Sequence, residues 1–71
     1  MRYLVVIENG PNSFGAYVPD LPGCVAVAKT RGRVKRLIRE AIQLHVEDMR
    51  ERGYPIPKPT AASEFVELQP A

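Results

Sequence analysis

The chain has 71 residues, a formal net charge of +2, one cysteine and one histidine. A domain of this size buries only about 60% of the surface that its unfolded chain exposes, so its own core is thin. One cysteine excludes an internal disulfide, and with a single histidine it makes a structural zinc site implausible. The small net charge does not by itself point to nucleic acid or to a membrane. We therefore expect one domain over residues 1–71 that is stabilised by self-association, as a homodimer or a dimer of dimers.

Three short apolar segments near the amino terminus predict an antiparallel meander. Residues 2–8 are rich in β-branched side chains and end in a loop-forming sequence, and residues 14–18 suit their hairpin partner. Residues 24–28 are small or β-branched and form the third expected strand. Pro22 and Gly23, which precede this strand, fit the two central positions of a type II turn, because proline presets a negative φ and glycine accepts a positive one.

One long amphipathic helix is predicted over residues 31–52. Thr30 is a good N-cap, and Gly53 stands where a helix commonly ends in the left-handed conformation. The residues between them place an apolar stripe at helical spacing, namely Val34, Leu37, Ile38, Ala41, Ile42, His45 and Met49. This stripe is expected to cover one face of the sheet.

A fourth strand is predicted over residues 64–68, after a proline-rich extended connector. Because it would follow the helix as a crossover, it is expected to lie parallel to an earlier strand. The fold class is therefore α+β, with the order β-β-β-α-β and one helix on one face of the sheet. The first strand is apolar on both of its faces, and one helix can bury only one of them, so a second copy is expected against the other face or a sheet edge.

The residues that could carry chemistry do not assemble into a site. Cys24 has nothing near it in sequence to lower its pKa, and a free cysteine is usually a small buried hydrophobe. The carboxylates that a metal-dependent hydrolase would need are scattered along the chain at Glu8, Glu40, Glu64 and Glu67. We predict no catalytic residue, no cofactor and no metal site, and hence no enzyme.

A basic cluster at the start of the helix is the hardest feature to explain by stability. It comprises Arg31, Arg33, Lys35, Arg36 and Arg39, while acidic residues gather near the end of the helix. This order is unfavourable with respect to the helix dipole. In the reverse order, each well-placed charge would stabilise the helix by about 0.3–1 kcal/mol. The cluster could pair with acidic residues of a neighbouring subunit, bind an anion or nucleic acid, or contact an acidic patch on a partner protein. The lack of interleaved aromatic residues favours a protein contact.

Several segments in combination resemble the amino-terminal domain of HicB-like antitoxins, which inhibit HicA-like messenger-RNA-cleaving toxins. They are Asp20-Leu21-Pro22-Gly23-Cys24, the helix start at Thr30, the Glu40-Ala41 pair, and the helix exit from Gly53 to Pro57. The sequence departs from the family after Thr30, where Arg31-Gly32-Arg33 replaces the usual acidic residues. The chain also ends soon after the expected fourth strand, so the resemblance is to a short form without a DNA-binding segment.

The resemblance implies a truncated ribonuclease-H-like domain that neutralises a HicA-like toxin by occlusion. The contact elements that it suggests are Asp20, Leu21, Pro22, Gly23, Cys24, Tyr54, Pro55, Ile56, Pro57 and Phe65. The alternatives are a small nucleic-acid-binding protein that uses the basic helix start, and an orphan oligomer without a toxin. The opening apolar run is too short for a secretory signal, so a cytoplasmic protein without membrane contact is expected.

Overall fold

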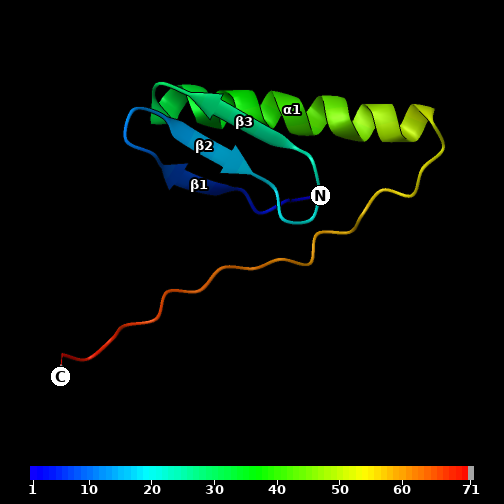
Figure 1. The fold of residues 1–71 in the computed structure, drawn as a ribbon. Helices are drawn as coiled ribbons and strands as arrows, with labels where there is room; N and C mark the ends of the chain where they lie inside the picture. The colour runs from blue at the N-terminus through cyan, green and yellow to red at the C-terminus, as the bar shows by residue number, and fades with distance from the viewer. Residues whose placement is uncertain (71) are drawn as a thin grey trace.

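The computed structural model describes residues 1–70 and consists of a three-stranded sheet and one helix (Figure 1). The strands are β1 (Val6–Asn9), β2 (Phe14–Tyr17) and β3 (Val25–Ala28), and the helix α1 spans Arg31–Glu51. Both strand pairs are antiparallel, and the sheet order is β1-β2-β3. The predicted α+β class, with three antiparallel strands followed by one long helix, is confirmed.

The helix covers one face of the sheet and lies toward its β3 side (Figure 1). It packs on β3 and β2 and makes no comparable contact with β1. Val34 and Ile38 are the buried residues of α1, and they meet small side chains such as Ala16 and Ala28 in the core. The alanines allow the helix to approach the sheet closely on this side.

Local signals define both ends of α1. The Thr30 hydroxyl accepts a hydrogen bond from the Arg33 N–H at 3.1 Å, which satisfies one of the free amides of the first turn. At the other end Gly53 adopts a φ of 70°, and the Tyr54 N–H donates to the Met49 carbonyl at 2.9 Å. A side chain at Gly53 would strain the backbone there, which explains why the helix stops at glycine.

A tight turn leads into β3. The Cys24 N–H donates to the Leu21 carbonyl at 3.1 Å, and Gly23 has a φ of 85°. Pro22 and Gly23 thus occupy the two central positions of a type II turn. The turn drives Leu21 and Cys24 into the core, where their exposed fractions are 1% and 3%.

The sheet is shorter than the sequence suggests at one strand. Ladder pairing of β1 with β2 begins at Val6, which lies opposite Tyr17, whereas we expected a strand from residue 2. Beyond Tyr17 the chain turns at Pro19, which has no N–H to donate, and the Val18 N–H is taken by the Cys24 carbonyl. Residues 2–5 therefore have no β2 partner.

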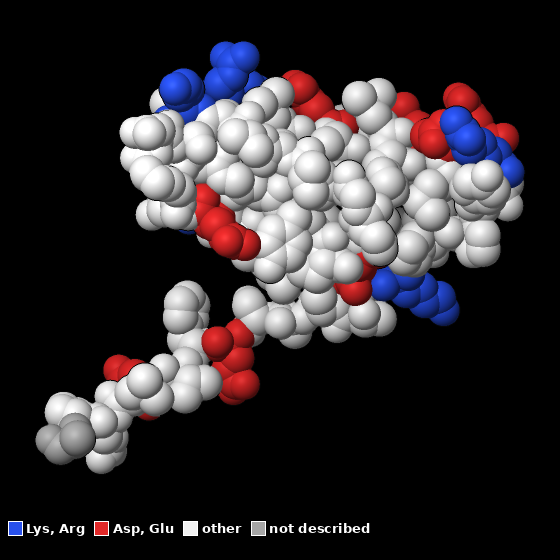
Figure 2. Space-filling view, in the orientation of Figure 1, with Lys and Arg blue, Asp and Glu red and all other residues white. Residues whose placement is uncertain are grey.

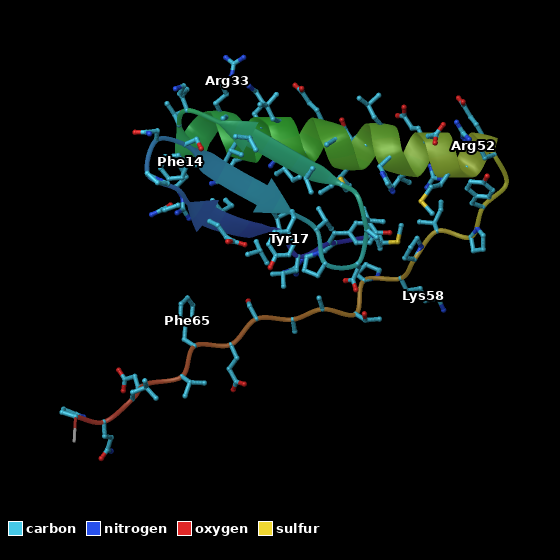
Figure 3. All side chains as sticks on the ribbon, viewed as in Figure 1. Phe14, Tyr17, Arg33, Arg52, Lys58 and Phe65 are labelled. Atoms are coloured by element: carbon cyan, nitrogen blue, oxygen red, sulfur yellow. The ribbon has the colours of Figure 1, made fainter. Side chains whose placement is uncertain are left out.

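The strand predicted over residues 64–68 is not formed in this chain. The segment after α1 is extended up to residue 70 and diverges from the sheet (Figure 1). A strand is stabilised by hydrogen bonds to a neighbour, and among residues 1–70 this segment has no strand beside it. The side chain of Phe65 is fully exposed and stands on the extended segment away from the sheet (Figure 3). Residues 62–70 are called the tail below.

Candidate protein-binding surfaces

The sheet face opposite α1 is largely apolar and exposed. Cross-strand partners share a face, so the register places Val6, Tyr17 and Val25 in one row and Glu8, Gly15 and Val27 in the next. Val25 is 62% exposed, Val27 is 68% exposed and Tyr17 is 40% exposed. These six residues form the outer sheet face, and Glu8 is its one charged member. An apolar patch of this kind on a small protein is typical of an interaction site.

Two features of the outer sheet face suit close contact with another protein. Gly15 lies in its middle, and a Cβ atom built there would meet nothing within 4 Å, so the centre of the face is flat and open. The strand β3 pairs only with β2, so its other edge offers backbone groups without a strand partner in residues 1–70. A partner could therefore lie on the face or extend the sheet at this edge.

A carboxylate joins the turn region to the chain that follows the helix. Asp20 accepts hydrogen bonds from the Thr60 N–H at 3.0 Å, the Thr60 hydroxyl at 2.8 Å and the Ala61 N–H at 3.0 Å. These bonds, with the Ala61 amide contributing most, hold the pKa of Asp20 below its usual value. The three bonds are called the Asp20 clasp. The Tyr3 hydroxyl adds a second tie by donating to the Pro57 carbonyl.

The basic cluster at the helix start is exposed and is not paired within the described chain. Blue side chains gather at the amino-terminal end of α1, and red ones lie along the tail (Figure 2). Arg33 projects from the helix away from the sheet (Figure 3). In residues 1–70 the one ion pair is between Arg52 and Asp48 at 3.0 Å, close to the other end of the helix. The positive charges of the helix start are thus available to an external anion or acidic surface.

The geometry gives no support to metal or thiol chemistry in the described residues. Across residues 1–70, no group of three or more histidine, cysteine or acidic side chains is arranged to hold a metal ion. Burial raises the pKa of the Cys24 thiol, which disfavours the thiolate that a nucleophile would need. No helix within this range is long and apolar enough to cross a membrane.

Comparison with known proteins decides the family. A model of the HicB-like antitoxin of bacterial toxin-antitoxin systems matches residues 3–70. The chain belongs to this family. A chain from the solved HicA3 and HicB3 toxin-antitoxin complex has a similar fold, with a TM-score of 0.71 and 28% identity over 84% of this chain and 70% of that one. The HicB-like resemblance that the sequence suggested is therefore confirmed.

The HicB-like chain also has relatives in phage, bacteria and archaea. It is 30% identical over 93% of its length to an uncharacterised 14.9 kDa protein of Haemophilus phage HP1, and it covers 50% of that protein. A UPF0150 protein of Helicobacter pylori is 43% identical over 62% of this chain and 61% of its own length. A UPF0150 protein of Thermoplasma acidophilum is 32% identical over 86% of this chain and 90% of its own. The HicB-like chain thus spans between half and two thirds of the first two relatives.

The structure separates the predicted contact residues of this HicB-like protein into two groups. Leu21 and Cys24 lie in the core, so a partner cannot reach them, and we correct the expectation that they form a contact surface. Their burial follows from the turn that they bracket. The surface members are Asp20, which is engaged in the clasp, and Pro22, Gly23, Tyr54, Pro55, Ile56, Pro57 and Phe65.

The sequence predicted a contact with a second copy on the face opposite the helix or at a sheet edge, but it did not identify the residues that form this face. The signal was present in the segment Val25-Ala26-Val27-Ala28, where large and small residues alternate. Alternation shows that the valines share a face, but it does not show which face the helix covers. The register with β2 decides this, because Ala26 and Ala28 lie opposite Ala16 and Phe14 on the helix side.

Proposed function

We propose that this HicB-like chain neutralises a HicA-like, messenger-RNA-cleaving toxin by occlusion, and that it does so as a non-enzymatic binding protein. Membership of the antitoxin family and the similarity to a chain of a toxin-antitoxin complex support the proposal. The observation that carries it at the level of residues is the outer sheet face. Its exposed valines would otherwise stay in water.

The composition of the outer sheet face fits a protein interface better than a small-molecule or RNA site. Val25 and Val27 offer branched apolar side chains, and Tyr17 offers an aromatic ring with a polar end. Interface cores are enriched in aromatic residues and depleted of charge, and the one charged residue of this face, Glu8, lies on the edge strand β1. We assign the toxin contact to this face, with the exposed turn at Pro22 and Gly23 at its margin.

A matched pair of substitutions tests the assignment. Val27→Glu places a charge on the outer sheet face, and Leu44→Glu places the same charge on α1 at a residue with nearly the same exposure, 68% against 67%. Co-expression with a HicA-like toxin from the same genome should restore growth for the unmodified chain and for Leu44→Glu. Val27→Glu should fail, because a buried unpaired charge costs an interface several kcal/mol.

Two results would count against the proposal. If the unmodified chain neither binds the toxin nor restores growth, the antitoxin function is wrong for this chain. If Val27→Glu restores growth as well as Leu44→Glu, occlusion does not use the outer sheet face. Circular dichroism on both variants ensures that a lost fold is not mistaken for a lost contact.

Nucleic-acid binding through the basic cluster is the second candidate function. It is favoured by the exposed positive charges of the helix start and by the absence of ion pairs there within residues 1–70. Phosphate contacts make affinity fall steeply with salt, whereas an apolar protein interface is much less sensitive. Replacing Arg31, Arg33 and Arg36 with serine should abolish RNA retention if this candidate is right. Unchanged RNA retention in this variant would show that the candidate is wrong.

We also propose that the protein self-associates and acts in the cytoplasm. Self-association is supported by the thin core of a 71-residue chain and by the exposed apolar side chains of the tail. A cytoplasmic location is supported by the proposed role, because a toxin that cleaves messenger RNA acts where that RNA is translated.

A further inference from the structure

The free edge of β1 borders an apolar groove beneath the helix. Because α1 packs on β2 and β3, the helix-facing side chains of β1 and of the residues before it are only partly covered. The gap has a volume of about 440 Å³, and its apolar walls are Tyr3, Val5, Ile7, Ile38 and Ile42. Lys35 and Arg39 stand at its rim. We call this gap the β1–α1 groove.

The tail carries the features of a strand without a partner. Phe65, Val66 and Leu68 are 102%, 75% and 89% exposed, although aromatic and β-branched residues favour sheets. Glu64 and Glu67 make the tail acidic, and residues 62–70 contain no basic residue. Its chemistry therefore complements the β1–α1 groove in two respects, since the groove has apolar walls and a basic rim.

The Asp20 clasp keeps the tail away from the β1 of its own chain. Thr60 and Ala61 both donate their N–H groups to Asp20, so these donors cannot start a ladder with β1. A second gap of about 560 Å³ separates residues 2–5 from residues 59–63, immediately before the tail diverges from the sheet (Figure 1). The groove of one chain is thus left open while its tail points away from it.

We propose that residues 64–68 of one copy add as a strand to the free edge of β1 in a second copy, and that the same residues of the second copy pair with β1 of the first. Running parallel to β1, the strand places Phe65 in the β1–α1 groove and Glu67 beside Lys35 and Arg39. Side chains alternate along a strand, so Val66 and Leu68 extend the apolar outer sheet face. A reciprocal exchange satisfies both edges at once and closes the assembly as a dimer. This inference rests on the proposed self-association and not on the proposed toxin.

The first test measures the oligomeric state of the full chain by light scattering across a concentration series. The unmodified chain should be a dimer, and Phe65→Ser should raise the dissociation constant about tenfold or more, because it removes the side chain that fills the groove. Tyr54→Ser, which alters an aromatic residue of 55% exposure outside the tail, should leave the dimer intact. A monomer at every concentration, or a dimer that Phe65→Ser does not weaken, would overturn the proposal.

A charge exchange separates pairing between copies from closure within one copy. Glu67→Lys alone and the double variant Lys35→Glu with Arg39→Glu should each weaken the dimer, because each copy then sets like charges against one another. In an equal mixture every tail can meet a complementary rim, so a heterodimer about as stable as the unmodified dimer should appear by native mass spectrometry. If mixing restores nothing, the tail does not cross between copies and the inference is wrong.

The outcomes for this inference and for the proposed function are independent. Val27 lies on β3, at the opposite edge of the sheet from the β1–α1 groove. Val27→Glu should therefore abolish toxin neutralisation and leave the dimer intact, whereas Phe65→Ser should weaken the dimer. A chain that dimerises through its tail but binds no HicA-like toxin would refute the proposed function and leave the exchange standing.

Discussion

The two faces of the three-stranded sheet carry similar apolar side chains and meet different surroundings. On the helix side, Ala16 and Ala28 are 4% and 8% exposed and lie beneath α1. On the opposite side, Val25 and Val27 are more than half exposed. The larger side chains of β3 thus point away from the core of the chain, and the smaller ones point into it.

This arrangement, with small side chains inside and larger ones outside, shows that the sequence of β3 serves two purposes. Alanine on the inner side lets the helix pack closely, and valine on the outer side favours the strand conformation while supplying apolar surface for another molecule. Four predictions test how far the two sides of the sheet differ, from the largest expected effect to the smallest.

The largest effect is expected from truncating a core side chain. Leu21 is fully buried, and Leu21→Ala should lower the free energy of unfolding by about 3 kcal/mol, because it removes apolar contacts and leaves a cavity. Val27→Ala on the outer sheet face should change it by less than about 0.5 kcal/mol in the unassembled chain. Urea unfolding followed by circular dichroism measures both. Equal losses would show that the outer face is not exposed in solution.

Adjacent positions of β2 should respond differently to added volume. Ala16 faces the helix, and Ala16→Leu should cost about 1–3 kcal/mol through overpacking. A Cβ at Gly15 meets nothing within 4 Å, and its φ is not positive, so Gly15→Ala should be neutral or stabilise the chain by about 0.4–1 kcal/mol. Thermal unfolding of the two variants provides the measurement. A destabilised Gly15→Ala would reveal a hidden contact on the outer face.

The helix that covers one face of the sheet is stabilised by its N-cap residue, Thr30. Thr30→Ala removes the acceptor of the Arg33 N–H and should destabilise the chain by about 1 kcal/mol, whereas Thr30→Ser keeps the hydroxyl and should stay close to the unmodified value. Hydrogen exchange of the first helical turn should accelerate in Thr30→Ala alone. If both variants behave alike, the hydroxyl does not secure the helix start.

The smallest effect concerns pH and the Asp20 clasp. The clasp holds the pKa of Asp20 below its usual value, so its contribution is fully present above the unfolded pKa of about 3.9 and is lost as the pH falls through the lower folded pKa. The amide signals of Thr60 and Ala61 should therefore shift only in that acidic range. Asp20→Asn should remove the titration from these amides. A transition close to neutral pH would contradict the assignment to Asp20.

Much of this fold follows from short-range signals. Thr30 and Gly53 predicted the ends of the helix, and Pro22 with Gly23 predicted the type II turn, because capping and turn geometry depend on a few adjacent residues. The resemblance to HicB-like antitoxins rested on the same local segments.

What the sequence could not determine depends on residues far apart in the chain. The Asp20 clasp joins residues 40 and 41 positions apart, and no local pattern pairs a turn carboxylate with the amides of Thr60 and Ala61. The composition of residues 64–68 indicates a preference for the strand conformation, but it does not show whether a neighbouring strand is available. A strand forms only where a neighbour pairs with it. Only the tertiary structure placed the valines of β3 outside and left the edge of β1 open, because both depend on where the helix packs.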